Sequence, residues 1–258
     1  MRVSYISCPL CSSSRFAPYC ECDCRGHSLY DPRLPPIIRW MRCADCAHVF
    51  VDGYFTDDAF AILFQRVHEY QSPAWNHDHN QRLLHARMVA SVANHRPDLG
   101  GRWLDVGFGN GLLMTTAEEF GFDVTGIDLR AASVRAMVDL GFRAECVDLA
   151  VFDAPKFDVI SMADVLEHMP FPKVGLTAAH RLLSDGGLLF LSMPNMDCFA
   201  WRSYDHFRTN PYWAELEHFH NFSRKRLYAL LEEHGFEPRS YGVSERYFVG
   251  MEVIAAKL

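Results

Sequence analysis

The segment Leu104–Gly111, LDVGFGNG, constrains the fold more than any other part of this 258-residue chain. An apolar run, RWLDV, leads into it, and a helical pattern begins at Leu112. Three alternating glycines, Gly107, Gly109 and Gly111, let the backbone turn tightly and approach a ligand, while the helix N-terminus offers free N–H donors. The segment predicts a strand, a ligand-binding turn and a helix, although the motif alone also fits a simple tight turn.

From Arg102 onward, apolar runs alternate with helical patterns. Helices are predicted over 112–120, 131–140 and 173–183, and the strand-like runs are RWLDV, FDVTGIDL, AECVDLA, FDVISMA and GLLFLSM. Alternation of strands and helices is typical of a parallel sheet with helices on both faces. We therefore expect an α/β fold with a doubly wound, mostly parallel sheet.

Acidic residues stand in three successive predicted strands. Asp105 lies in the first, Asp128 closes VTGIDL, and Asp148 closes ECVDLA with Leu149 beside it. The carboxyl ends of parallel strands share one crevice, where open α/β sheets bind ligands. Asp128 is therefore expected to accept hydrogen bonds from both hydroxyls of a ribose, and Leu149 to face a ring.

In combination these segments resemble the class I methyltransferases that use S-adenosylmethionine. LDVGFGNG is similar to their first motif, GIDL to their second-strand acid, ECVDLA to their adenine-binding strand, FDVISMADVLEHM to their fourth-strand segment and LLSDGGLLFLSMPN to their fifth strand. A nicotinamide-binding Rossmann enzyme would need G-x-G-x-x-G, whereas Leu112 stands at the place of its third glycine. The resemblance covers about 100–258 and implies a seven-stranded, Rossmann-like sheet.

The same resemblance implies S-adenosylmethionine as the cofactor, bound where the strands end. The residues assigned to it are Asp105, Gly107, Gly109, Gly111, Asp128, Leu129, Asp148, Leu149 and Ala163. Within this set the glycines would border the methionyl part, Asp128 the ribose, and Asp148 with Leu149 the adenine.

The cysteines indicate a metal site. Seven of the nine fall within the first 46 residues. The N-terminus has no apolar leader and no later stretch reaches 18 apolar residues, so we expect a cytoplasmic protein without a membrane span. A reducing compartment does not keep structural disulfides, and the pairs Cys8-Pro-Leu-Cys11 and Cys43-Ala-Asp-Cys46 can supply four thiolates to a tetrahedral zinc ion.

Two alternatives to this ligand set remain open. Cys20, Cys22 and Cys24 could replace a ligand or be additional thiols. A redox function of either pair is the other alternative, but neither pair opens a helix after a strand, as the thioredoxin arrangement requires. We therefore expect three regions: a zinc-ribbon-like module over 1–53, a helical linker or lid over 54–97, and the methyltransferase domain over 98–258.

The order of segments in this chain resembles that of bacterial sugar C-methyltransferases and their shorter relatives: CPLC, then RCADCAHVFVD, then the methyltransferase core. The resemblance implies a catalytic pair, Glu217 and His218, and a substrate-side tyrosine, Tyr70. His218 would titrate near neutral pH and remove a proton from a substrate hydroxyl or acidic carbon, with Glu217 holding its tautomer. A surface or packed histidine is the alternative reading of His218, and His168 is expected to line the pocket.

Two further segments are notable. Residues 195–222 are long and aromatic, which is typical of a lid or substrate wall, although an aromatic packing cluster would have the same composition. His77, His79 and His85 could suggest a metal motif, but His79 and His85 are six positions apart and do not share a helix face, so the group is expected at the solvated surface.

The expected function is methyl transfer to a small-molecule acceptor, a sugar or an intermediate of a natural product or polysaccharide. The net charge of -7 argues against a nucleic-acid partner, and so against an RNA methyltransferase, which a cysteine module before such a core also resembles. A zinc- and cofactor-binding regulatory or interaction protein without turnover is the other alternative. The sequence does not indicate an oligomeric state.

Overall fold

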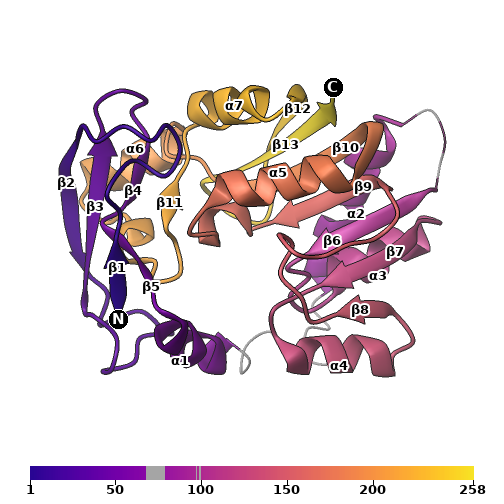
Figure 1. Cartoon of the computed structure of the whole chain (residues 1–258), viewed down its shortest axis with the longest axis horizontal. Coiled ribbons are helices and arrows are strands. Elements are labelled where there is room, and N and C mark those ends of the chain that lie inside the picture. The colour runs from indigo at the N-terminus through magenta and orange to yellow at the C-terminus, as the bar shows by residue number, and fades with distance from the viewer. Residues whose placement is uncertain (68–78, 97, 99) are drawn as a thin grey trace.

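The computed structural model describes residues 1–67, 79–96, 98 and 100–258, which form a small N-terminal unit and a larger α/β unit (Figure 1). The N-terminal unit is built from β1 (Arg2–Ser4), β2 (Phe16–Asp23), β3 (Ile37–Cys43), β4 (Val49–Val51) and β5 (Gly53–Phe55). Two helices, α1 (Asp57–Val67) and α2 (His79–Ala93), follow this unit before the α/β unit begins. β5 pairs with β1 and extends past residue 53.

The α/β unit contains one seven-stranded sheet in the order β12-β13-β10-β9-β6-β7-β8. Its strands are β6 (Arg102–Val106), β7 (Asp123–Ile127), β8 (Arg143–Glu145), β9 (Phe157–Ala163), β10 (Leu183–Pro194), β12 (Phe236–Val243) and β13 (Gly250–Lys257). β13 is antiparallel to both of its neighbours, and the remaining neighbours along the sheet are parallel. The predicted mostly parallel sheet is thus confirmed.

Helices cover both faces of this sheet. Leu188 and Phe190 of β10 belong to the core formed with α2, α3 (Leu112–Glu119) and α4 (Ala131–Asp139). Their alternate neighbours, Leu189 and Leu191, belong to the core formed with α5 (Pro172–Leu182) and α7 (Arg224–Glu233). Because successive side chains of a strand point to opposite faces, this division confirms the doubly wound arrangement.

One predicted strand is much shorter than expected. β8 ends at Glu145, so Asp148 does not close a strand as predicted. The edge strand β8 pairs only with the last three residues of β7, Thr125–Ile127, and the Asp128 N–H adds a bond to the Glu145 carbonyl at 3.2 Å; after Glu145 the chain does not continue along the sheet edge. It turns instead, with the carbonyl of Asp148 accepting the N–H groups of Val151 and Phe152.

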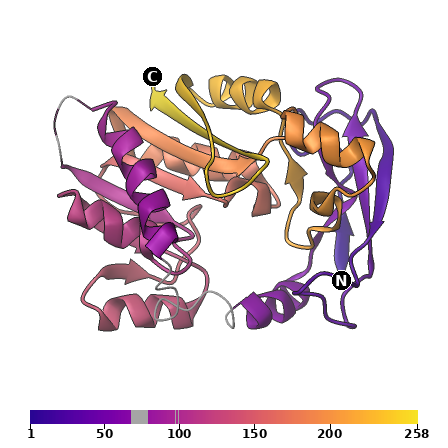
Figure 2. The ribbon, with the colours of Figure 1, turned by 180° about the vertical axis from the view of Figure 1, so that it is seen from behind.

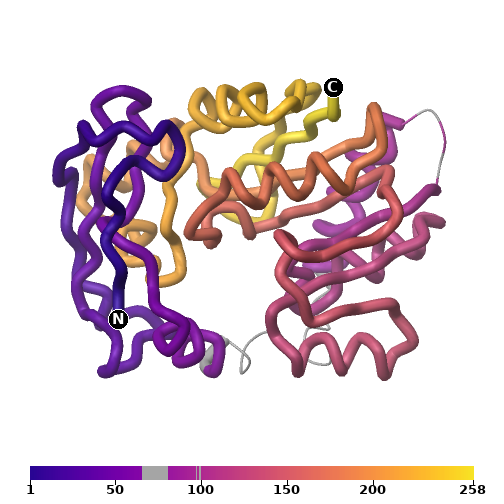
Figure 3. Tube along the Cα trace, viewed as in Figure 1, coloured from indigo at the N-terminus to yellow at the C-terminus, as the bar shows by residue number. Residues whose placement is uncertain are grey.

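Residues 195–222 do not form one long loop. They contain α6 (Phe199–His206), a 3₁₀ turn over Pro211–Ala214 and the two-residue strand β11 (His220–Asn221). β11 leaves the α/β unit and becomes the edge of the N-terminal four-stranded sheet, whose order is β11-β4-β3-β2. Figure 2 shows this segment and α6 against the N-terminal strands, and the chain trace in Figure 3 shows the crossing.

Among the described residues, no helix combines the length and apolar character that crossing a bilayer requires.

Candidate active site and cysteine cluster

One large cavity connects the strand ends of the sheet with the N-terminal helix α1 and with the 211–218 segment. Its volume is about 1140 Å³, above the roughly 300–1,000 Å³ of common small-molecule pockets. The predicted residues that line it are Asp105, Gly107, Gly109, Asp128, Leu129, Asp148, Leu149, Ala163, Glu217 and His218. The cofactor and catalytic predictions therefore converge on one space, large enough for two ligands.

The glycine turn between β6 and α3 has the backbone that its sequence predicts. Gly107, Gly109 and Gly111 all have positive φ, at 63°, 59° and 78°. A side chain at Gly107 would meet Cγ2 of Val165 at 2.8 Å, and one at Gly111 would meet Sδ of Met137 at 2.5 Å. The positive φ favours glycine at these two positions, and a larger residue would also force Val165 or Met137 to move.

Asp128 directly follows β7, as predicted, and its carboxylate is already engaged. Oδ2 accepts the N–H of Gly109 at 3.1 Å and Nη2 of Arg130 at 2.7 Å. Oδ1 accepts the backbone N–H and Nε of Arg130. These four contacts fill the lone pairs of the carboxylate, so Asp128 holds the glycine turn, and ribose hydroxyls would have to displace Arg130 to reach it.

The adenine end of the predicted site lies after β8. Asp148 and Leu149 both line the cavity, with Leu149 buried and Asp148 accepting the N–H of Ala150 at 2.7 Å. Leu129 also lines the cavity and is 53% exposed. An apolar residue and an acid thus flank the cavity here, although a turn rather than a strand end presents them.

Asp105 is enclosed within β6. Its Oδ1 accepts the hydroxyl of Ser161 at 2.6 Å, while Oδ2 is buried with no partner among the described residues. Burial raises the pKa of Asp105 to about 7. A buried carboxyl with one free oxygen at the cavity wall is suited to a cationic or N–H group of a ligand.

At the other end of the cavity three side chains form a compact group: Glu167, His168 and His218. Their ligand atoms all lie within 4.8 Å of one another, and the His168 and His218 rings are 4.8 Å apart at 79°. Neither carboxylate oxygen of Glu167 has a partner in another described residue, and burial raises its pKa to about 8. Burial opposes protonation of His168, but the charges of Glu167, Glu217 and Asp164 outweigh it and raise the His168 pKa.

His218 differs from its prediction in two respects. Burial, together with His168 and two further histidines, holds its pKa well below 6.5, so it does not titrate near neutral pH. No contact joins the carboxylate of Glu217 to the imidazole; instead the Glu217 carbonyl accepts Nδ1 of His168 at 3.1 Å. Among the described residues Nδ1 of His218 has no hydrogen-bond partner and is buried, so the Glu217 backbone holds the ring of His168 rather than that of His218.

Sequence reasoning missed an ion pair on the cavity wall. Arg246 and Tyr247, from the β12–β13 connection, bind Asp164 at 3.0 Å and 2.8 Å. Burial works against the charge of Arg246, but Asp164 raises its pKa. Asp164 directly follows β9, so the strand-end rule could have found it, whereas no local pattern marks the other two residues.

His85 was expected at the surface and is buried. It is 7% exposed, lines the cavity from α2, and its Nδ1 donates to the Gln81 carbonyl at 2.6 Å. His85 is buried because α2 packs against α3 and turns a side with polar residues, Gln81 and His85, toward the cavity. The side chains of His77 and His79, and the whole of Tyr70, lie outside the described part of the chain.

The aromatic segment contains the predicted packing cluster and also reaches the cavity. Trp213 packs on Trp40 and Trp201, and the Trp213 carbonyl accepts Nε1 of Trp40 at 2.9 Å. Tyr212 in the same turn lines the cavity. One side of this turn is a packing cluster against the N-terminal sheet, and the other is a wall of the site.

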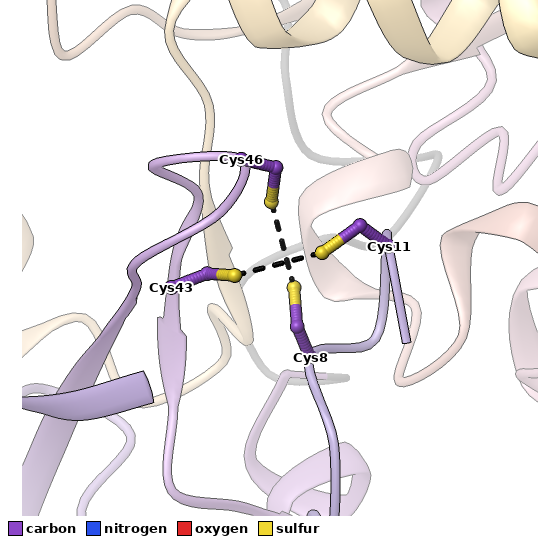
Figure 4. A group of neighbouring side chains, drawn as sticks. All are labelled: Cys8, Cys11, Cys43 and Cys46. Atoms are coloured by element: carbon purple, nitrogen blue, oxygen red, sulfur yellow. Dashed lines mark hydrogen bonds between the residues drawn. The ribbon is translucent and has the colours of Figure 1, made fainter. Parts of the chain in front are cut away.

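The four predicted metal ligands lie together (Figure 4). The sulfurs of Cys8 and Cys46 are 3.7 Å apart and those of Cys11 and Cys43 are 3.5 Å apart. Four sulfurs at 2.3 Å from a central zinc ion would be separated by about 3.8 Å, so the spacing fits a tetrahedral site. The adjacent Cys8 thiol and burial raise the pKa of Cys46.

The three additional cysteines lie elsewhere. Cys20 and Cys22 are in β2, and Cys24 is buried with its thiol donating to the Pro36 carbonyl at 3.1 Å. They are not members of the four-sulfur group.

Residues 75–241 match a family model described as a methyltransferase domain. The ubiquinone biosynthesis O-methyltransferase of Xanthomonas oryzae pv. oryzae (strain PXO99A) is 38% identical over 150 residues, which are 54% of this chain and 60% of that protein. The enzyme of the same name from Xanthomonas campestris pv. campestris (strain B100) is 37% identical over 150 residues. The match spans about three-fifths of the length of these relatives.

Solved methyltransferases share the fold. The 1,6-didemethyltoxoflavin-N1-methyltransferase of Burkholderia thailandensis, with S-adenosylhomocysteine bound, has a TM-score of 0.58 at 18% identity, covering 83% of this chain and 97% of that one. The N-methyltransferase NodS of Bradyrhizobium japonicum WM9, in complex with S-adenosylhomocysteine, has a TM-score of 0.56 at 14% identity, covering 75% and 97%. At such identities the likeness concerns the fold alone.

Proposed function

The chain belongs to the methyltransferase-domain family, and on that premise we propose that it transfers a methyl group from S-adenosylmethionine to a hydroxylated small molecule. We place the acceptor among sugars and intermediates of natural products or polysaccharides. The observation that carries the proposal is the single cavity that joins the glycine turn to His168 and His218. A donor at the turn and an acceptor at the imidazoles would meet within it.

The cofactor half of the cavity is assigned to the residues around the turn. Gly107 and Gly109 leave room for the methionyl part, Asp105 offers its free Oδ2 to the amino group, and Asp148 with Leu149 borders the adenine. Asp128 holds the turn and reaches the ribose when Arg130 yields. When bound, S-adenosylmethionine supplies an activated methyl group, so the protein needs chiefly to align the reacting atoms.

His218 is the proposed general base. Its low pKa keeps the imidazole neutral at physiological pH, and Nδ1 is buried, so Nε2 is the nitrogen that can take a proton from the acceptor. His168, whose pKa is raised by the surrounding carboxylates, can donate a hydrogen bond to the acceptor from the same group. The neutral imidazole of His218 suits proton removal, and the more basic imidazole of His168 suits hydrogen-bond donation.

The acceptor half supports a hydroxylated ligand. Phe60, Phe64 and Tyr212 supply apolar and aromatic walls, while Asp57 and Glu215 supply acceptors for hydroxyl groups. The O-methyltransferase activity in the names of the curated relatives favours oxygen as the methylated atom.

We also propose that Cys8, Cys11, Cys43 and Cys46 hold a structural zinc ion. With all four tetrahedral positions taken by sulfur, such a site leaves no position for a substrate. The metal therefore stabilises the N-terminal unit and takes no part in the chemistry.

Two experiments test the proposal. Calorimetric titration with S-adenosylhomocysteine asks whether the chain binds the cofactor product, and a screen of sugars, nucleotide sugars and phenols for its formation from S-adenosylmethionine asks for turnover. Binding with turnover supports an enzyme. Binding without turnover on any acceptor class would instead support the regulatory alternative, and turnover only on RNA would support the nucleic-acid alternative.

A further inference from the structure

We propose that the cysteine unit positions the catalytic segment through two hydrogen-bonded routes, one through His48 and His220 and one through Tyr5. The inference rests on the proposed function, because it concerns the segment that carries Glu217 and His218. It makes His48, His220 and Tyr5 positioning residues, although none of the three lines the cavity.

The first observation is that the backbone of the catalytic segment is shared between the two units. The Phe219 carbonyl accepts the N–H of Val51 at 3.0 Å, and the Phe219 N–H donates to the Glu167 carbonyl at 2.9 Å. Residue 219 thus lies between β4 and the turn that carries Glu167. His218, one residue earlier, is placed by the same pairing.

The second observation is the histidine pair. Nε2 of His220 lies 2.9 Å from the Met169 carbonyl, and its Nδ1 lies 3.0 Å from Nε2 of His48. A carbonyl only accepts, so Nε2 of His220 must carry its proton; a neutral ring then leaves Nδ1 as an acceptor, and Nε2 of His48 must donate to it. The proton positions of both rings follow from this one carbonyl.

The two routes begin at different cysteine pairs and end at adjacent carbonyls. His48 follows Cys46 by two residues, and its carbonyl accepts the N–H of Cys43 at 2.9 Å, so the second cysteine pair determines where His48 lies. Tyr5 precedes Cys8 by three residues, and its hydroxyl donates to the Pro170 carbonyl at 2.6 Å.

These carbonyls, of Met169 and Pro170, directly follow His168. A turn held by hydrogen bonds from Tyr5 and from the His48–His220 pair keeps His168 beside His218, and the rings of His168 and His218 are in edge-to-face contact. Small displacements at a reacting group are costly, so such remote support is expected to matter for turnover.

The first test reads the proton positions in the full-length, zinc-loaded protein. Long-range ¹H–¹⁵N correlation spectra of labelled histidine distinguish the two neutral tautomers, and His48→Gln and His220→Gln assign the signals. We expect both rings to carry the proton on Nε2. A signal showing His220 protonated on Nδ1 would overturn the proposed route.

The second test compares variants by hydrogen exchange with S-adenosylhomocysteine as the probe. His48→Phe keeps the ring packing but removes the donor, and Tyr5→Phe removes only a hydroxyl. Each is expected to speed exchange of the Phe219 and Val51 amides at least tenfold, while affinity for S-adenosylhomocysteine stays within twofold. His48→Gln, which keeps a donor near the same place, is expected to restore most of the protection, and the exposed His95→Phe should change nothing.

Unchanged exchange in both His48→Phe and Tyr5→Phe would overturn the proposal. Should His48→Phe fail to fold, Tyr5→Phe and the tautomer measurement still decide it. Once an acceptor is known, His48→Phe should lower kcat with little change in the KM for S-adenosylmethionine. Because exchange and tautomers need no turnover, an inactive wild-type protein would contradict the proposed function while leaving the positioning routes to be judged separately.

Discussion

The carboxylate of Asp128 holds the glycine turn, and we propose that it also binds the ribose of the cofactor. It was expected to bind a ribose, and the structure shows its oxygens holding Gly109 and Arg130. Asp128→Ala removes both the turn anchor and the ligand contacts, and charge-assisted hydrogen bonds contribute about 1.5–3 kcal/mol each. We expect S-adenosylhomocysteine to bind at least tenfold more weakly by calorimetry.

Two further variants locate the cause. Asp153→Ala, at a side chain that is 93% exposed, is the matched control and should bind normally. Arg130→Ala should bind as tightly as the wild type or more tightly if Arg130 competes with the ribose. A loss in Arg130→Ala as large as in Asp128→Ala would show that the pair acts only by holding the turn.

At His218 the prediction concerns rate rather than binding. His218→Ala should leave the affinity for S-adenosylhomocysteine within twofold, yet lower the turnover rate roughly 10²–10⁴-fold, the usual contribution of a general base. A variant that turns over at the native rate would show that His218 is a packing residue.

The direction of the His218 pKa shift predicts the pH profile. A base whose pKa lies below 6.5 stays neutral as pH falls from 8 to 6.5, so protonation of His218 should not lower turnover over that interval and should lower it only at lower pH. A histidine with an ordinary pKa would be half protonated at pH 6.5. The residual turnover of His218→Ala should not show this fall at low pH. If the fall persists in the variant, it is caused by another titrating group.

At the scale of elements, the turn between β6 and α3 can be tested with a pair of glycines. Gly111→Ala places a carbon 2.5 Å from Sδ of Met137 at φ 78°, whereas Gly121→Ala has a similar φ of 93° and nothing within 4 Å. Both variants carry backbone strain of about 1–3 kcal/mol, but only the first adds a clash. Denaturant unfolding should therefore show a larger loss of stability for Gly111→Ala, and equal losses would contradict the packing described for the turn.

The cysteine cluster predicts a metal stoichiometry. Elemental analysis of protein purified without chelator should find one zinc ion per chain, and Cys43→Ser should lower that value, whereas Cys22→Ser should not. A value of two would point to the group of Glu167, His168 and His218 as a second metal site. It would also exclude His218 as the general base, since the metal would occupy the lone pair of the imidazole.

Local patterns predicted the elements whose partners are close in sequence. The alternation after Arg102 correctly indicated α3, α4, α5 and the parallel strands, because each is paired or covered by its neighbour along the chain. β11 could not be found, since two residues carry no period and their pairing with β4 joins positions some 170 apart. The predicted strand at β8 was too long, because the length of β8 depends on where its partner β7 ends.

At the scale of the whole molecule, sequence patterns likewise located the site residues that follow local motifs and not those brought in by distant contacts. Gly107, Gly109, Asp128 and the Glu217–His218 segment were located from sequence and line the cavity, whereas Gly111 does not. Arg246 and Tyr247 were not located from sequence, because a hairpin brings them to Asp164 across some 80 residues. The partnership of Glu217 with His168, rather than with His218, likewise depends on how two distant turns meet.

The buried histidines make the folded state sensitive to acid. Burial lowers the pKa of His220 to about 4, against about 6.5 when the chain is unfolded. The unfolded state therefore binds more protons below pH 6.5, and stability falls as pH decreases from 6.5 toward 4, by on the order of 3 kcal/mol for this group. Denaturant unfolding of His220→Gln should show a smaller loss between pH 7 and pH 4.5 than the wild type; an equal loss would assign the effect to other groups.

The pairing of β4 with β11 has a consequence for how the chain is made. The N-terminal sheet is missing its edge until residue 221 has left the ribosome, so during synthesis of about 170 residues β4 presents open backbone groups of an apolar strand, Val49–Val51. Unpaired strands of this kind are templates for association between chains, and contacts this distant form slowly. Nascent chains released before residue 221 would thus be prone to aggregate, and refolding would be slowest at the step that docks β11.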